Sequence, residues 1–276
     1  IAGDAHDRDI VVYRIPSFLA VTLAVLALFW LGRGLVSPET ALVASVLFAV
    51  APLTVLVSQL AIAEGLSLLP ATVAMLALAR IYSNDEEPIG TVLLFWAAVG
   101  VGMLINALLV PILVLATVIA LYIFDRDWGW LKRLNPVIGV PIALLIASPW
   151  IYVRVHQDGT AFSGLSMREV LAALGGAQDM KLRAFPGTFV LALLLGFIPG
   201  TMLIGTAFKR FWAERDQRLQ RFLIAWVIGY LIYLELLSSK PGTYMVQTMF
   251  PALALGVAII VTREHGAGKK PEWSGF

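Results

Sequence analysis

The sequence predicts an all-α fold, that of a polytopic integral membrane protein with about nine transmembrane helices. Its 276 residues are 59% hydrophobic and only 14% charged, and the mean hydropathy is +0.86. A soluble domain is typically about 45–50% apolar and about 25% charged, so the composition excludes an ordinary soluble protein. Apolar runs of nearly membrane-spanning length also alternate with short polar segments, and a spanning helix needs roughly 20 apolar residues. The net charge of +2 gives no reason to expect a nucleic-acid partner; membrane lipids are the expected surroundings.

The predicted spans form one transmembrane domain over residues 1–262, followed by a cytoplasmic tail at 263–276. In order, they are residues 17–32, 41–57, 65–80, 90–105, 107–124, 134–152, 186–206, 222–238 and 243–262. The break at Asn106 is short, so one long kinked helix is the alternative for the fourth and fifth spans. The closely spaced glycines of "VGVGMLIN" (99–106) indicate close helix packing.

A long loop, residues 153–185, joins the sixth and seventh predicted spans. It contains "SMREVLAAL", in which Ser166 is suited to cap a helix and Glu169 occupies the capping-box position three residues later. The sequence therefore predicts a short helix lying at the membrane surface within this loop.

Arginine and lysine residues orient the predicted spans. The segment "KRFWAERDQRLQR" (209–221) holds five basic residues in thirteen, which places it in the cytoplasm by the positive-inside rule. Counting spans outward from it leaves 13 of the 20 basic residues on that side. The loop 153–185 and the amino terminus then lie outside. An external amino terminus with no signal-peptide pattern leads us to expect at least one further helix upstream of Ile1.

Glu64 opens the third predicted span at its external end. A carboxylate in a first helical turn is favoured by the helix dipole, which is the simpler explanation. Ionisable groups at this depth are costly and usually functional, so we expect Glu64 to have a functional role. No P-loop, Ser–His–Asp pattern or metal-ligand cluster is evident, so nucleotide-driven chemistry is not indicated. The metal requirement is unknown, and a divalent cation held by a carboxylate is an alternative to direct proton transfer.

Lys240 lies between the last two predicted spans, and Tyr244 follows four residues later. A lysine at a span end often extends only to the interface, which is one explanation. The other is that the ammonium and the tyrosine hydroxyl bind a phosphate. An external phosphate held near the membrane is a lipid phosphate.

Three more residues are candidates for substrate binding. Glu235 lies near the outer end of the eighth span, where a carboxylate must be paired, protonated or facing a polar cavity. Packing against a polar neighbour is the alternative for it. Arg154 and His156 begin the external loop, next to the predicted site.

Four stretches, in order along the chain, carry a resemblance to a known family. They are "YRIPSFLAVTLAVLALFWLGRGL" (13–35), "APLTVLVSQLAIAEGLSLL" (51–69), "FPGTFVLALLLGFIPGTML" (185–203) and "RFLIAWVIGYLIYLELLSSKPGTYMVQTMFPALAL" (221–255). The chain resembles the bacterial membrane glycosyltransferases of the GT-C class, which include aminoarabinose transferases of lipid A and protein O-mannosyltransferase-like enzymes. The resemblance covers roughly residues 13–262 and rests on several weak motifs in the right order.

The resemblance implies a GT-C-like fold and the transfer of a sugar from a polyprenyl-phosphate carrier. The acceptor would be a lipid, glycan or protein at the periplasmic face of the bacterial inner membrane. In such enzymes an aspartate of the first external loop is the general base, and a second acid assists. Glu64 matches the second acid, whereas Lys240 and Tyr244 match positions that hold the carrier phosphate. The first external loop would precede residue 1, so we expect the principal catalytic aspartate to lie upstream.

Three positions depart from the family pattern: Gln59 replaces a common arginine, Asn106 a common lysine, and Gln247 a common proline. These changes leave open a non-catalytic homologue that binds the lipid carrier. A transporter or flippase of lipid-linked sugars is the other alternative, although no inverted repeat relates the two halves of the chain.

Overall fold

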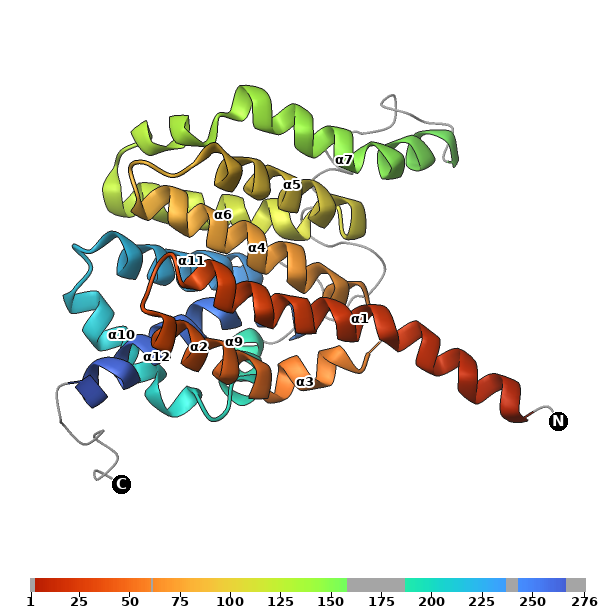
Figure 1. The fold of residues 1–276 in the computed structure, drawn as a ribbon, viewed down its shortest axis with the longest axis horizontal. Helices are drawn as coiled ribbons and strands as arrows, with labels where there is room; N and C mark the ends of the chain where they lie inside the picture. The colour runs from red at the N-terminus through yellow and green to blue at the C-terminus, as the bar shows by residue number, and fades with distance from the viewer. Residues whose placement is uncertain (1–2, 61, 158–186, 237–242, 267–276) are drawn as a thin grey trace.

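The computed structural model describes residues 3–60, 62–157, 187–236 and 243–266, and every regular element within these ranges is helical. The predicted all-α fold is confirmed. The helices form a bundle (Figure 1) and are α1 Gly3–Gly32, α2 Pro38–Val50, α3 Pro52–Ser58, α4 Ala63–Ser83, α5 Ile89–Ile105, α6 Leu109–Asp125, the 3₁₀ helix η1 Gly129–Leu134, α7 Pro136–Gln157, α9 Thr188–Gly196, α10 Thr201–Ala213, α11 Arg218–Leu236, the 3₁₀ helix η2 Thr243–Met249 and α12 Phe250–Gly266.

The number of membrane spans is supported only in part. Within the described ranges, four helical segments are long and apolar enough to cross a membrane: Tyr13–Gly32, Ala63–Ser83, Arg218–Leu236 and Thr243–Arg263. Two bent helix pairs, α2 with α3 and α9 with α10, raise the number to six if each pair is one span. The remaining apolar helices, α5, α6 and the first part of α7, are shorter. A multi-pass membrane protein is therefore established, whereas nine spans stays a prediction.

Two segments that the sequence predicts as single helices are bent pairs. The segment 41–57 breaks between α2 and α3, which meet at 64°. Ala51 is extended there because the residue before a proline is driven out of the helical region, and Pro52 begins α3. The segment 186–206 breaks between α9 and α10, which meet at 110° across a Pro199–Gly200 pair, a common helix-ending signal.

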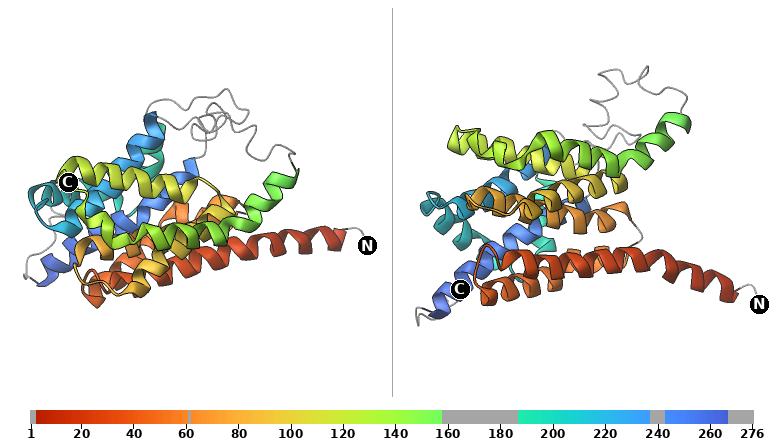
Figure 2. Two further views of the ribbon diagram at one scale, coloured as in Figure 1. Left: turned by 90° about the horizontal axis from the view of Figure 1, so that it is seen from above. Right: turned by 45° about the horizontal axis from the view of Figure 1, so that its top comes forward.

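Two other boundaries differ from the simplest expectation. The alternative of one long kinked helix at Asn106 is wrong, because Asn106 is extended and ends α5 before α6 returns alongside it (Figure 1). At the start of the chain, residues 4–9 belong to the first turns of α1, so this helix begins well before residue 17, where the first span is predicted to start. These turns project beyond the rest of the bundle (Figure 2).

The bundle packs around α4, which contacts α1, α5, α6 and α11. Its buried residues include four alanines, Ala71, Ala74, Ala77 and Ala79. Small residues let helix backbones approach closely, which is how membrane helices gain van der Waals contact. Leu145 and Met202, in contrast, are 73% and 75% exposed, as expected of side chains that face lipid.

Glycine is required where two pairs of helices cross. A Cβ at Gly100 of α5 would lie 2.8 Å from the carbonyl oxygen of Ala143 in α7. A Cβ at Gly229 of α11 would lie 2.6 Å from the carbonyl oxygen of Ala116 in α6. The predicted packing role of the glycines in 99–106 is confirmed.

Candidate functional site

The candidate site lies at the end of the bundle where α4 begins and α11 ends. The 3₁₀ helix η2 is the element that connects this region, since it contacts α3, α4, α9, α11 and α12. Figure 1 shows the start of α4 and the end of α11 at the same end of the bundle, and η2 contacts both helices. Segments far apart in sequence therefore supply one surface.

Glu64 lies in the first turn of α4, and its side chain is partly buried. The residue that caps this helix, Ile62, provides no side-chain hydrogen bond. The free N–H groups at a helix start carry partial positive charge, so they stabilise an ionised carboxylate there. The acid therefore lies at the start of a helix, at the end of the bundle where η2 packs.

The neighbouring Gly65 is packed against α1. A Cβ at this glycine would lie 3.2 Å from Ser17 Oγ and 3.2 Å from Val57 Cγ1, and Ser17 itself is only 1% exposed. Ser17 belongs to the arginine–apolar–Pro–Ser stretch that the sequence singled out. Two motifs of the family resemblance are thus in direct contact, and this contact fixes the helix turn that carries Glu64.

Tyr244 lies in η2, on the same side of the molecule as Glu64, and its side chain is partly buried. Three residues later, the fully buried Gln247 donates a hydrogen bond from Nε2 to the backbone carbonyl oxygen of Glu64, at 3.2 Å. The turn that holds the tyrosine is therefore tied to the turn that holds the acid. The sequence marks Gln247 only as a departure from the family pattern; a buried glutamine between two apolar stretches was the signal for this link.

A small polar cluster surrounds this link. Thr248 donates a hydrogen bond from Oγ1 to the backbone carbonyl oxygen of Met245, at 2.9 Å, and the buried Tyr230 of α11 lies near Thr248 and Glu64. Among the described residues, Gln247 Oε1 has no hydrogen-bond partner although it is buried. Sequence reasoning missed Tyr230 and Thr248, because a single tyrosine or threonine in an apolar helix carries no distinctive pattern.

Glu235 is held by the backbone of another helix. Its carboxylate accepts hydrogen bonds from three N–H groups at the start of α9: Gly187 at 2.9 Å, Phe189 at 3.0 Å and Val190 at 3.1 Å. Gly187 adopts a φ of +92°, which favours glycine, and it offers no side chain of its own to cap the helix. The contacts that the structure shows for Glu235 are those of a helix cap; contact with substrate stays a prediction.

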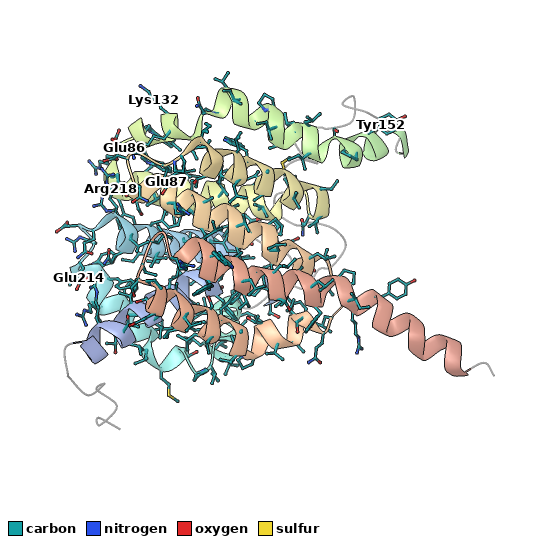
Figure 3. The ribbon with its side chains drawn as sticks, viewed as in Figure 1. Glu86, Glu87, Lys132, Tyr152, Glu214 and Arg218 are labelled. Atoms are coloured by element: carbon teal, nitrogen blue, oxygen red, sulfur yellow. The ribbon has the colours of Figure 1, made fainter. Side chains whose placement is uncertain are left out.

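The remaining predicted site residues are only partly described. Lys240 and the predicted surface helix of the loop 153–185 lie outside the described residues. Arg154 and His156 belong to the last turns of α7, but their side chains are also outside the description. Tyr152, slightly earlier on α7, lies at the end of the bundle opposite to Glu86, Glu87 and Glu214 (Figure 3). In the part of the chain that is described, no group of three or more His, Cys, Asp or Glu residues is placed to hold a metal ion.

The opposite end of the bundle carries a network of ion pairs. Asp85 accepts from Arg133 and Arg218, both at 2.6 Å, and Glu214 is bound by Arg263 at 2.7 Å. The hydrogen bond from Arg218 is the main reason why the pKa of Asp85 lies below its ordinary value, and the bond from Arg263 does the same for Glu214. Figure 3 labels two of these residues, Arg218 and Glu214, at the same end of the bundle. This is the end that the sequence assigns to the cytoplasm, so the described charges follow the predicted sidedness.

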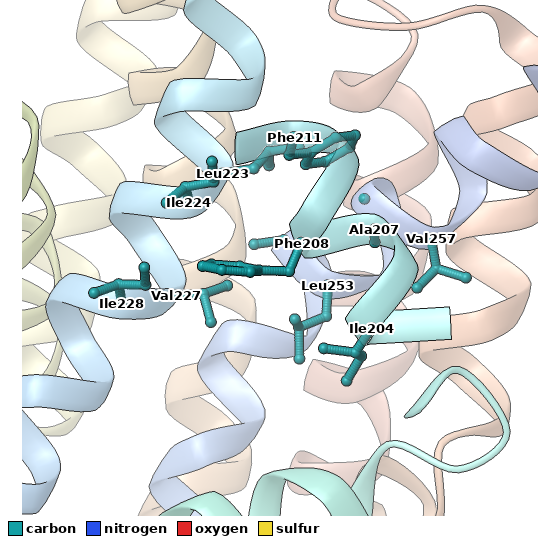
Figure 4. A pocket seen from close by; sticks show the side chains of 12 residues that line it. Ile204, Ala207, Phe208, Phe211, Leu223, Ile224, Val227, Ile228, Leu253 and Val257 are labelled. Atoms are coloured by element: carbon teal, nitrogen blue, oxygen red, sulfur yellow. The ribbon is translucent and has the colours of Figure 1, made fainter. Parts of the chain in front are cut away.

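A small apolar cavity of about 70 Å³ lies between α10, α11 and α12 (Figure 4). Phe208, Phe211 and Leu253 are among the side chains that line it. The lining offers no group for polar chemistry, so this cavity does not compete with the Glu64 region as a reaction site.

The fold and the arrangement of the site can be compared with those of known protein families. Residues 5–153, more than half of the chain, match the family described as dolichyl-phosphate-mannose-protein mannosyltransferase, and the chain belongs to this family.

Two curated relatives carry the name undecaprenyl phosphate-alpha-4-amino-4-deoxy-L-arabinose arabinosyl transferase. The one from Edwardsiella ictaluri is 26% identical over 262 residues, which is 93% of this chain and 47% of the relative. The one from Pseudomonas paraeruginosa is 27% identical over 254 residues, covering 90% and 45%. The chain thus spans about half the length of the curated relatives it matches.

Solved structures agree on the fold. The apo structure of ArnT from Cupriavidus metallidurans superposes with a TM-score of 0.78 at 17% identity, covering 92% of this chain and 46% of that one. The structure of the same protein bound to undecaprenyl phosphate gives 0.77 at 18% identity, covering 91% and 46%. The predicted GT-C family and its fold are confirmed by these matches.

Proposed function

We propose that this chain is part of an enzyme that transfers a sugar from a polyprenyl-phosphate-linked donor to an acceptor at the periplasmic face of the bacterial inner membrane. The observation that carries the proposal is the link between α4 and η2, through which Gln247 holds the acid Glu64 beside the turn of Tyr244. This region lies at the end of the bundle opposite to the ion-pair network, and therefore outside if that network is cytoplasmic.

The names of the relatives favour undecaprenyl phosphate as the carrier. The relatives are named for transfer of 4-amino-4-deoxy-L-arabinose from this carrier, and one structural neighbour binds undecaprenyl phosphate. A lipid acceptor is our proposal over a glycan or a protein acceptor. The identity of the sugar is left open, because Gln59, Asn106 and Gln247 depart from the family pattern.

In the proposed reaction, an acceptor hydroxyl attacks the anomeric carbon of the sugar. A new carbon–oxygen bond forms while the bond to the carrier phosphate breaks, and the phosphate leaves with the bonding electrons. The hydroxyl proton passes to a carboxylate, and Glu64 assists this proton transfer. Lys240 and the Tyr244 hydroxyl would bind the leaving phosphate, whose negative charge increases in the transition state. Attack from the face opposite the phosphate inverts the anomeric centre.

The proposal is tested with the full-length protein, a polyprenyl-phosphate-linked sugar and a lipid acceptor in detergent solution. We expect Glu64→Gln to lower kcat by about 10²-fold, the lower end of a typical general-base contribution. We expect Lys240→Ala to raise KM for the donor and to lower kcat. Glu86→Gln, which removes an exposed carboxylate at the other end of the bundle, is the matched control. Turnover unchanged in both site variants would remove these assignments.

The same experiment separates the enzyme from a transporter or flippase. Detergent micelles have no two leaflets, so translocation has no product there, whereas a transferase still forms the glycosylated acceptor. Lipid-linked sugar that moves across proteoliposome membranes, with no glycosylated acceptor in micelles, would favour transport.

A further inference from the structure

A polar cleft of about 640 Å³ lies at the charged end of the bundle, far from the candidate site. Four parts of the chain line it: the connection into α2, the last residue of α4, the start of α11 and the end of α12. The proposed transfer reaction makes no use of this cleft.

The cleft presents charges of both signs. Arg218 and Arg263 line it, each about half exposed and each paired through Nη1 with a carboxylate. A guanidinium has five N–H donors, so both arginines keep donors for a further anionic oxygen. Glu39 also lines the cleft, is exposed in the first turn of α2, and forms no ion pair with any described residue. The lining therefore offers spare donors together with one unpaired carboxylate.

Two buried oxygen atoms in the cleft lining have no hydrogen-bond partner among the described residues. Gln220 lines the cleft and is only 2% exposed, and its Oε1 has no hydrogen-bond partner among the described residues. The Ser83 Oγ, also in the lining, is buried and likewise without a partner there. A buried acceptor without a partner costs free energy, and a ligand N–H group near these side chains would offset that cost.

The lining also includes apolar side chains, those of Leu35, Val36, Leu219 and Ile259, next to the uncharged polar residues Ser37, Thr40, Gln217 and Thr262. A free metabolite has no need of such a surface, whereas a lipid presents a charged headgroup next to its apolar chains. A cleft that combines arginines, an unpaired carboxylate and apolar side chains matches a headgroup with both a phosphate and a protonated amine.

We propose that this cleft binds an amine-bearing zwitterionic phospholipid of the cytoplasmic leaflet, of the phosphatidylethanolamine type. The phosphate lies at Arg218 and Arg263, and the ammonium donates to Glu39. The site is independent of sugar transfer and stabilises the end of the bundle where α2, α4, α11 and α12 meet.

The test uses the full-length protein in detergent, titrated with short-chain phosphatidylethanolamine, phosphatidylcholine and phosphatidylglycerol. Binding is measured by native mass spectrometry and as a shift in Tm. Phosphatidylcholine has no N–H to donate and phosphatidylglycerol has no cation, so we expect each to bind about tenfold more weakly than phosphatidylethanolamine. Glu39→Gln is expected to weaken phosphatidylethanolamine about tenfold and to leave phosphatidylcholine binding unchanged.

Glu86→Gln is again the matched control, because Glu86 is an exposed carboxylate at the same end of the bundle but outside the cleft lining. Glu39 is itself exposed, so its replacement is not expected to unfold the protein. Equal binding of all three lipids, a preference for phosphatidylglycerol, or identical behaviour of the Glu39 and Glu86 variants would each overturn the proposal.

Discussion

The carboxylate of Glu235 is expected to stabilise the start of α9 rather than to contribute charge alone. It accepts hydrogen bonds from Gly187, Phe189 and Val190, and no side chain of the α9 cap residue replaces it. Glu235→Ala removes all three acceptor contacts. Glu235→Gln keeps one acceptor oxygen but turns an NH₂ group toward backbone N–H donors.

The expected loss of stability depends on which backbone N–H donors are left with neither the carboxylate nor water as a hydrogen-bond partner. Loss of a helix N-cap costs about 1 kcal/mol. An unpaired buried donor costs about 1–3 kcal/mol more, and of the three residues only Phe189 has a buried side chain. We therefore expect Glu235→Ala to lower the free energy of unfolding by about 2–4 kcal/mol, and Glu235→Gln by about 1–2 kcal/mol.

The assay combines chemical unfolding in mixed micelles with hydrogen exchange of the peptide that contains residues 187–197. Faster exchange confined to the first turn of α9 is the specific sign of a lost cap. Glu86→Gln controls for loss of a carboxylate without contacts to α9. If Glu235→Ala leaves both exchange and unfolding free energy at the control values, the capping role is wrong.

Three further predictions test packing, charge and sidedness. Gly229→Ala is expected to lower the free energy of unfolding by about 1–3 kcal/mol through overpacking, whereas Gly205→Ala, with no atom within 4 Å of the added Cβ, should be neutral or slightly stabilising in the same unfolding assay. The pKa of Asp85 is lower in the folded protein, so its ion pairs stabilise the fold at pH values above the ordinary pKa of 3.8, and this stabilisation is lost as the pH falls below that value. Asp85→Asn should therefore reduce the dependence of the unfolding free energy on pH, measured from pH 6 to about pH 3. An unchanged pH dependence would contradict this. The chain has no cysteine, so single cysteines at Glu64 and Glu214 can be labelled without background by an impermeant thiol reagent, and labelling of both from the same side of sealed vesicles would refute the proposed orientation.

The all-helical bundle was predictable because long apolar runs leave few alternatives in a membrane. Breaks in these helices were harder to predict, since Pro52 lies at a break, where α2 has ended and α3 begins, whereas Pro70 lies inside α4 without interrupting it. What separates the two cases is the packing around each proline, which a single sequence does not contain.

For the candidate site, the structure bears only on where the predicted residues lie. The assignment of each span end to one side of the membrane predicted that Glu64 and Tyr244 lie at one end of the bundle, and they do lie at one end in the structure. The partner of Glu235 was beyond prediction, because its hydrogen bonds go to the backbone of a segment some 45 residues earlier, and backbone N–H groups leave no mark in a sequence. Gln247 shows the same limit, since its donor reaches a carbonyl group 183 positions away.

The hydrogen bond of the Gln247 amide couples the turn that holds Tyr244 to the turn that holds Glu64. A lipid phosphate that draws the tyrosine turn toward itself would also displace the first turn of α4, and with it the carboxylate. The proposed sugar donor and acceptor should then not bind independently: saturation with one is expected to change the apparent affinity for the other. Gln247→Leu should abolish this coupling of the two affinities while leaving each substrate able to bind alone.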